Sequence, residues 1–170
     1  MAIGTSQVKP GWNGAEARPI LEEEARREGG LLPALHRLME RFGHIPEEAD
    51  ALIAEVFNIS RAEVKGVISF YHDFRREPAG RHVLRLCRAE ACQSQGGREL
   101  ARRFREMSGL DWGDTSPEGA LTLEPVYCLG LCAVAPAALF DDEPVGRLDG
   151  TRLEELLARA RGARLAEKRR

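Results

Sequence analysis

The chain has 170 residues, 43% of them hydrophobic and 31% charged, and its formal net charge is -2. These values are typical of a soluble globular protein with one medium-sized domain or two small ones. The small net charge argues against a dedicated nucleic-acid binder, which needs a strong basic surplus. No apolar stretch approaches the ~20 residues that span a bilayer, and residues 1–14 lack the apolar core of a secretory signal. We therefore expect a cytoplasmic protein without a membrane span or a nucleic-acid partner.

Glycines and prolines without an apolar period occupy residues 1–19, which predicts an extended arm. A helical bundle is expected to follow over residues 20–78. Its first clear helix is predicted over residues 31–42, where leucines and other apolar residues recur at three- and four-residue steps. Gly43 stands where a left-handed cap would end this helix.

Two further helices are predicted in the bundle. Pro46 suits the first position of one helix, and the apolar residues within 49–57 form its buried face. Ser60 and Glu63 have the spacing of a capping box at the start of the next helix, whose apolar stripe ends at Tyr71. The apolar stripes indicate helices that pack against one another.

The pattern changes at the turn signal Pro78-Ala79-Gly80, after which residues 79–161 are predicted to form a second domain. Strands are expected at 82–87 and 120–125, where apolar residues alternate with polar ones. A helix is expected between them at 97–108. Helices and strands are thus mixed in this half of the chain.

A hairpin and a helix complete the predicted second domain. Residues 137–140 and 145–148 flank Asp-Asp-Glu-Pro and are expected to form the hairpin strands, and Thr151 is expected to cap a last helix that Gly162 ends. The resulting order, β-α-β-β-β-α, suggests an α/β sandwich of thioredoxin-like kind. The predicted fold class is therefore α+β. Residues 162–170 form a basic tail that is expected to be solvated, or alternatively to contact an acidic partner.

Four cysteines in the predicted second domain are the strongest chemical signal in the sequence. Cys87 and Cys92 are separated by four residues, and Cys128 and Cys132 by three. Each pair lies where a predicted strand ends, so each pair could hold one metal atom while the fold brings the two loops together. A 2Fe–2S cluster needs two thiolates on each iron, which this arrangement provides.

The spacing alone leaves other interpretations open. Structural zinc also takes four cysteines with gaps of this size, whereas a reducing cytoplasm disfavours disulfides. Gly130 permits a tight backbone path in the second loop, and apolar neighbours are expected to shield the sulfurs from water. These neighbours are Leu129, Leu131, Ala133 and Val134. The candidates for offsetting the negative charge of a reduced cluster are Arg85, Arg88 and Arg98.

A set of motifs accompanies the cysteines in a fixed order. The set comprises Val67-Ile68-Ser69-Phe70-Tyr71, Pro78-Ala79-Gly80, Cys87-x4-Cys92 with Gly96-Gly97, Cys128-Leu129-Gly130-Leu131-Cys132, and Ala135-Pro136. It resembles the thioredoxin-like 2Fe–2S subunit of NADH-oxidising modules (the complex I 2Fe–2S subunit family), from about Leu31 to about Ala160. The resemblance implies a helical bundle followed by a thioredoxin-like ferredoxin domain. It also implies one 2Fe–2S cluster whose ligands are Cys87, Cys92, Cys128 and Cys132.

Within that family, three stretches are similar to the gamma subunit of molybdenum-dependent, NAD-linked formate dehydrogenases. They are residues 87–94, 124–132 and 146–148. Complex I relatives more often carry Asp-Gly-x-Phe where this chain has Pro117-Glu118-Gly119-Ala120.

The resemblance implies a non-catalytic electron-transfer subunit of a formate dehydrogenase complex, without a substrate site of its own. Its expected partners are an FMN/NADH-binding iron–sulfur subunit and a molybdenum-containing subunit, which would carry FMN, further clusters and the molybdenum cofactor. The equivalent subunit of complex I or of an NAD-reducing hydrogenase is an alternative. A zinc-stapled, non-redox assembly module is a second alternative.

The remaining polar and aromatic residues suggest no catalytic site. The histidines have no ligand-like spacing and are expected to be surface or packing residues; they are His36, His44, His72 and His82. Trp12 in the predicted arm is an interface candidate. Residues 141–143 form an acidic cluster beside a turn, which we interpret as a surface feature rather than a metal site.

Overall fold

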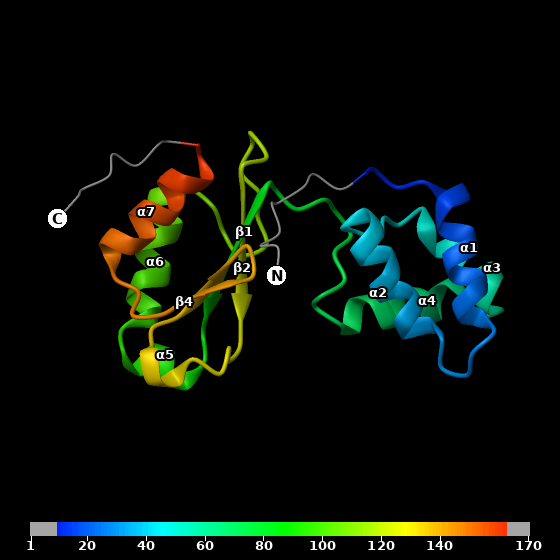
Figure 1. The fold of residues 1–170 in the computed structure, drawn as a ribbon, viewed down its shortest axis with the longest axis horizontal. Helices are drawn as coiled ribbons and strands as arrows, with labels where there is room; N and C mark the ends of the chain where they lie inside the picture. Colours follow the sequence, from blue (N-terminus) through cyan, green and yellow to red (C-terminus); the bar gives the residue numbers. More distant parts are fainter. Residues whose placement is uncertain (1–9, 163–170) are drawn as a thin grey trace. The chain divides into compact units, whose positions relative to one another are not determined.

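The computed structural model describes residues 10–162. The chain forms two compact units, of which one ends at Pro78 and the other begins at Ala79 (Figure 1). In the described residues the first unit is helical, and all of the strands belong to the second unit. This organisation confirms the predicted α+β class, in which a helical bundle precedes a domain of mixed helices and strands.

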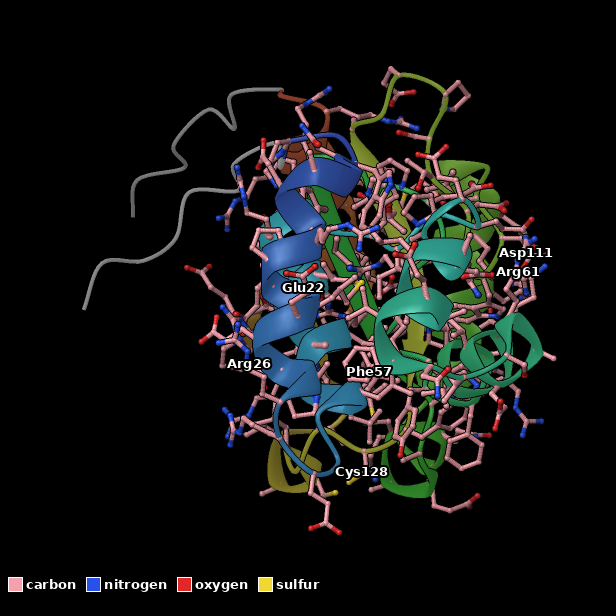
Figure 2. The ribbon with its side chains drawn as sticks, turned by 90° about the vertical axis from the view of Figure 1, so that its right-hand side faces the viewer. Glu22, Arg26, Phe57, Arg61, Asp111 and Cys128 are labelled. Carbon is pink, nitrogen blue, oxygen red and sulfur yellow. The ribbon has the colours of Figure 1, made fainter. Side chains whose placement is uncertain are left out.

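Four α-helices make up the described part of the first unit. They are α1 (Gly14–Ala25), α2 (Leu31–Phe42), α3 (Ala49–Phe57) and α4 (Arg61–Phe70). Their apolar faces form one core, whose largest fully buried side chains include Leu21, Leu35, Leu38, Phe42 and Ile53. Burial of such a side chain stabilises a fold by ~1.5–3 kcal/mol, so this core holds the bundle together. The outward polar surface of α1 and its C-terminal cap includes Glu22 and Arg26 (Figure 2).

Two helix ends in the bundle follow the local signals in the sequence. Gly43 is left-handed, with a φ of 78°, and its N–H donates to the Met39 carbonyl at the end of α2. At the start of α4, the Ser60 hydroxyl accepts a hydrogen bond from the Glu63 N–H at 3.1 Å. The Glu63 carboxylate accepts one from the Ser60 N–H at 2.8 Å, which confirms the capping box.

The predicted extended arm over residues 1–19 is wrong for residues 14–19, which belong to α1. The Asn13 side chain begins this helix by accepting hydrogen bonds from the backbone N–H groups of Ala15 at 3.0 Å and Glu16 at 3.3 Å. An asparagine at the N-cap satisfies N–H groups that the first helical turn cannot pair internally. The first nine residues of the predicted arm lie outside the described part of the chain.

Two other predictions for the bundle need correction. α3 begins at Ala49 and not at Pro46, which precedes the helix by one short turn. Trp12 is half-buried rather than free, because its ring packs edge-on against Phe42 with 5.2 Å between the ring centroids. Trp12 therefore contributes to packing within the first unit.

The second unit contains a four-stranded sheet with the order β2-β1-β3-β4. The strands are β1 (His82–Cys87), β2 (Leu121–Val126), β3 (Ala138–Phe140) and β4 (Glu143–Val145). β1 pairs in parallel with β2 and antiparallel with β3. The parallel register places Cys87 beside Val126, so the carboxyl ends of β1 and β2 meet at one edge of the sheet.

Two helices, α6 (Gly97–Ser108) and α7 (Gly150–Ala160), lie side by side over one face of this sheet (Figure 1). The core between these helices and the sheet is apolar and includes Leu84, Leu123, Phe104, Phe140, Leu153 and Leu157. The short helix α5 (Glu90–Ser94) follows β1, and the 3₁₀ helix η1 (Cys132–Val134) precedes β3. Among residues 10–162, every helix is too short or too polar to cross a membrane.

Most predicted elements of the second domain are present, but the last hairpin and the last helix begin elsewhere. β4 covers 143–145 rather than 145–148, because Asp141 and Asp142 form a tight turn with φ values of 51° and 68°. Pro144 therefore lies on β4, an edge strand, where a sheet tolerates proline. Asp149 rather than Thr151 caps α7, since its carboxylate accepts a hydrogen bond from the backbone N–H of the third helical residue at 2.8 Å. The sequence pattern did not predict α5.

Candidate metal centre

The first cysteine pair lies on regular secondary structure. Cys87 ends β1, and its N–H donates to the Ala137 carbonyl at 3.0 Å, which ties it to the residue before β3. Cys92 lies in α5, which turns the chain back toward the strand end. Both residues are buried, with 7% of Cys87 and 2% of Cys92 exposed. Secondary structure and burial thus hold this pair in place without a contribution from a metal.

The second pair lies on the loop that follows β2. Cys128 is left-handed, with a φ of 71°, and Gly130 has a φ of 74°. These two conformations fold the loop tightly before Cys132 begins η1. The Sγ atoms of Cys128 and Cys132 are 4.0 Å apart, and both residues are exposed.

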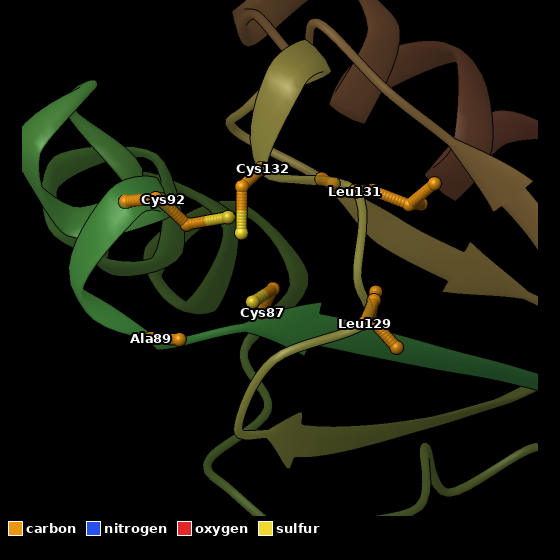
Figure 3. A pocket seen from close by; sticks show the side chains of 8 residues that line it. Cys87, Ala89, Cys92, Leu129, Leu131 and Cys132 are labelled. Carbon is orange, nitrogen blue, oxygen red and sulfur yellow. The ribbon is translucent and has the colours of Figure 1, made fainter.

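The parallel pairing of β1 and β2 brings the two loops together at one edge of the sheet. Cys87, Cys92 and Cys132 line one pocket (Figure 3). Cys128 is not part of this lining, but its thiol lies beside that of Cys132. The other residues that line the pocket are apolar: Ala89, Ala91, Leu129, Leu131 and Ala137. The sequence-predicted cysteines therefore converge, although 35 residues separate the two pairs.

Hydrogen bonds to sulfur distinguish the cysteines of the first pair. Burial of the Cys87 thiol opposes ionisation, but it accepts hydrogen bonds from the backbone N–H of Ala89, the Cys92 thiol and the backbone N–H groups of Cys128 and Leu129, so its pKa lies below the ordinary cysteine value. Two successive backbone N–H groups of the second loop thus donate hydrogen bonds to the Cys87 sulfur of the first pair. For Cys92, burial and the hydrogen bond with Cys87 raise the pKa.

The second pair has a different electrostatic balance. Its hydrogen bond with the Cys128 thiol raises the pKa of Cys132, and the nearby Cys87 acts in the same direction. Ionisation of one thiol in such a pair disfavours ionisation of the other, and the positive charge of a bound metal would favour the thiolate form of both.

The shielding residues that we expected are present in part. Leu129 and Leu131 line the pocket, whereas Ala133 is exposed and Val134 is half-buried away from the lining. The three alanines of the pocket wall were not predicted from the sequence. Ala89 and Ala91 lie between Cys87 and Cys92, and this position is the only local signal that could have identified them; no local signal marks Ala137.

The arginines proposed to offset cluster charge already have other partners. Arg85 pairs with Glu124 at 3.0 Å and with Asp142. The Arg88 guanidinium lies over the Trp112 ring at 5.0 Å from its centroid. Arg98 donates to the Gln93 side chain at 2.8 Å. Each of these contacts accounts for its arginine without a cluster.

The donor set suits a 2Fe–2S cluster. All four cysteines are free, and they come as two pairs around an apolar pocket. In the part of the chain that the structure describes, no three His, Cys, Asp or Glu side chains gather closely enough to hold one metal ion. Two thiolates for each of two irons is the arrangement that this cluster requires.

The chain belongs to the thioredoxin-like [2Fe-2S] ferredoxin family, whose model matches residues 17–161. This match confirms the class of protein and the fold that the motifs predicted. A member of this family carries one 2Fe–2S cluster, so the cofactor is an iron–sulfur cluster rather than structural zinc.

Relatives of known identity have similar lengths. NADH-quinone oxidoreductase subunit 2 of Thermus thermophilus is 36% identical over 143 residues, which are 83% of this chain and 79% of the relative. The NADP-reducing hydrogenase subunit HndA of Solidesulfovibrio fructosivorans is 29% identical over 143 residues, 84% of each chain. Among solved structures, an NAD+-reducing [NiFe]-hydrogenase matches with a TM-score of 0.65 at 25% identity. The match covers 82% of this chain and 24% of that one.

Proposed function

We propose that Cys87, Cys92, Cys128 and Cys132 hold the cluster, and that the chain is an electron-transfer subunit of an NADH-oxidising complex. The observation that supports this most strongly is the convergence of two thiol pairs on an apolar pocket at the carboxyl ends of β1 and β2. When bound, a 2Fe–2S cluster accepts and releases one electron. The chain's own residues position the irons, exclude water on one side and leave the other side accessible. Four free thiols suit a cytoplasmic location.

The partner that we propose is an FMN/NADH-binding iron–sulfur subunit. Exposed aromatic residues on each unit are suited to protein contacts, because aromatic side chains are enriched at interfaces. Tyr127, which is 69% exposed, directly precedes Cys128 in the second unit. In the first unit, Phe70 is 74% exposed and Tyr71 is 39% exposed at the end of α4. Their rings contact each other with 5.1 Å between centroids, so they form one aromatic patch.

The particular complex that we propose is an NAD-dependent formate dehydrogenase with a molybdenum-containing subunit. This proposal is supported by the similarity of residues 87–94, 124–132 and 146–148 to the gamma subunit of such enzymes. The absence of Asp-Gly-x-Phe at 117–120 also supports it. A second candidate is the equivalent subunit of an NADH-quinone oxidoreductase or of an NAD(P)-linked hydrogenase. The names of the relatives favour it.

Metal analysis of the purified chain tests the ligand proposal. Protein made anaerobically with sufficient iron should contain about two irons and two acid-labile sulfides per chain. Stoichiometric zinc without sulfide would refute the proposal. The dithionite-reduced protein should give the EPR signal of a reduced 2Fe–2S centre.

Co-expression tests the proposed complex. With its flavin subunit, the chain should form a stable pair that oxidises NADH with artificial acceptors, and the molybdenum subunit should add formate-dependent NAD reduction. The chain alone should do neither. Purification with quinone-reductase or hydrogenase subunits instead would refute the formate assignment and leave the cluster assignment intact.

We also propose that residues 79–161 are an independent cluster-binding domain. The boundary after Pro78 and the position of all four cysteines in the second unit support this. A fragment of these residues should contain iron and sulfide in the same ratio as the full chain, but it should bind the flavin subunit less tightly. A folded fragment without iron would show that the bundle helps to form the site.

A further inference from the structure

We propose that Gly97 and Gly146 are positioning residues for the cluster, each holding one cysteine loop by a close backbone approach that a side chain would prevent. Gly97 acts on Cys92, and Gly146 acts on Cys132 through Val134. The inference rests on the proposed ligand set and concerns how this chain presents those ligands.

The first residue of α6 lies against the backbone of Cys92. A Cβ atom on Gly97 would come within 2.6 Å of the Cys92 carbonyl oxygen and 3.0 Å of its carbonyl carbon, and 3.5 Å from its Cβ. Both clashing atoms are backbone atoms, so no rotamer change can relieve the contact. Helix propensity favours alanine over glycine at such a position. The helix alone would favour alanine at position 97, but the short distance to the Cys92 backbone excludes a Cβ atom there.

Neither side of this contact can shift freely. α6 is anchored by Phe104, which is fully buried in the core between helices and sheet. On the other side, the Gln93 N–H donates to the Ala89 carbonyl at 3.0 Å, and its side chain donates to the Arg88 carbonyl at 2.6 Å. Displacement by a new Cβ would therefore move Cys92 within the pocket rather than the helix alone.

The second contact is made by Gly146, which follows β4 and precedes α7 in the chain. A Cβ atom on Gly146 would lie 2.5 Å from Cγ2 and 2.8 Å from Cβ of Val134, and 3.1 Å from its carbonyl oxygen. Val134 is β-branched and stiff about χ1, and it belongs to η1 with Cys132. The lack of a side chain at Gly146 thus allows η1 to lie close to the segment that follows β4.

Backbone hydrogen bonds beside Gly146 fasten the same loop. The Arg147 N–H donates to the Val134 carbonyl at 2.6 Å, and the Leu148 N–H donates to the Pro136 carbonyl at 2.9 Å. Leu148 is buried in the core. The segment 146–148 therefore connects the residues after Cys132 to the core of the domain. A side chain at position 146 would push these two segments apart.

Gly150 provides a matched control for Gly97. Each is the first residue of a long helix in the same unit. The three atoms nearest to a Cβ on Gly150 would all belong to the guanidinium of Arg103, with Nη1 at 2.7 Å, and this surface side chain can change rotamer. Gly66, inside α4, has open space where a Cβ would stand and provides a control in the other unit.

The experiment uses the full chain, purified anaerobically with its native iron and sulfide. The variants are Gly97→Ala, Gly146→Ala, Gly150→Ala and Gly66→Ala. The readouts are the EPR g-values of the reduced protein, the midpoint potential, and the rate of iron loss to a chelator. Circular dichroism reports the fold. A merely structural role would lower thermal stability without moving the g-values or the potential.

We expect Gly97→Ala to shift the g-values and to lose iron about ten times faster than the unmodified chain, as the removal of outer-shell support typically does. Gly146→Ala should show a smaller effect in the same direction, because it clashes mainly with a side chain. Adding Val134→Gly to Gly146→Ala should restore the spectrum toward that of Val134→Gly alone, since the two atoms within 3.0 Å would be gone. Both control variants should match the unmodified chain.

Unchanged g-values, potential and iron-loss rates in folded Gly97→Ala and Gly146→Ala would overturn the inference and leave the proposed function standing. If Gly97→Ala does not fold, Gly146→Ala and its Val134→Gly rescue decide in the same way. A lack of rescue would overturn the path through Val134. An unmodified chain without iron and sulfide would overturn the proposed function, and the inference with it.

Discussion

The first cysteine pair is buried on a strand end and a short helix, whereas the second is exposed on a loop with two left-handed residues. Both pairs supply the same donor atoms, but the fold gives them different surroundings. The buried pair, Cys87 and Cys92, supplies a rigid and dry anchor. In the proposed ligand set, the exposed pair, Cys128 and Cys132, would form the side of the cluster that a partner protein can approach. Burial and exposure are thus divided between two segments of the chain.

Single alanine substitutions should erase the difference between the pairs. Each iron needs two thiolates, so we expect Cys87→Ala, Cys92→Ala, Cys128→Ala and Cys132→Ala all to lose the visible spectrum and the iron. Absorbance, iron content and sulfide content measure the loss, with circular dichroism as the control for folding. An alanine variant with normal iron and spectrum would remove that cysteine from the ligand set.

Serine substitutions should separate the pairs. A hydroxyl is a harder and poorer ligand for iron than a thiolate, so every serine variant should be weakened. In the buried pair the hydroxyl is also shielded from water, which adds a desolvation cost of ~1–3 kcal/mol.

We therefore expect Cys128→Ser and Cys132→Ser to retain more iron than Cys87→Ser and Cys92→Ser. Iron content after identical purification compares the four variants. Equal retention in both pairs would show that burial does not distinguish them.

Alkylation of the cluster-free chain should sharpen the comparison between exposure and ionisation. The thiolate is the reactive form, and hydrogen bonds place the pKa of Cys87 below the ordinary cysteine value despite burial. Even so, Cys128 and Cys132 should be alkylated first, because the reagent can reach them.

Mass spectrometry of the alkylated peptides gives the order. Since its neighbour raises the pKa of Cys132, its alkylation should keep accelerating with pH above the value at which an ordinary cysteine levels off. The urea-unfolded chain, in which all four thiols are accessible, is the control. Faster labelling of Cys87 in the folded chain would mean that ionisation outweighs access.

A substitution in the bundle should leave both pairs unchanged. Ser60→Ala removes the capping box of α4 and should cost about 1 kcal/mol of stability. Thermal unfolding measures this loss. The EPR spectrum and the iron content should equal those of the unmodified chain, because Ser60 belongs to the first unit. A changed spectrum would reveal coupling between the bundle and the cysteine pairs.

Local chemistry explains which elements could be predicted. The alternation of residues 82–87, the apolar period of 97–108 and the Ser60–Glu63 spacing are properties of neighbouring residues, and the structure has these elements where they were expected. The helix in residues 14–19 was missed although Asn13 is a good N-cap. Pro19 and the nearby glycines outweighed that signal in the sequence analysis.

By itself the sequence determined the ligand candidates, the order of the strands and most of the helices, and the family, because cysteine spacing and motif order can be read without knowing which residues are in contact. Tertiary structure alone decided which pair is buried, since the parallel register of Cys87 beside Val126 joins segments far apart in the chain. It also decided that Arg85 is held by Glu124 and Asp142, and that Gly97 and Gly146 touch the cysteine loops. The Gly97 contact depends on the angle between α5 and α6, and the Gly146 contact on how the chain after β4 returns to η1, and neither is a property of neighbouring residues.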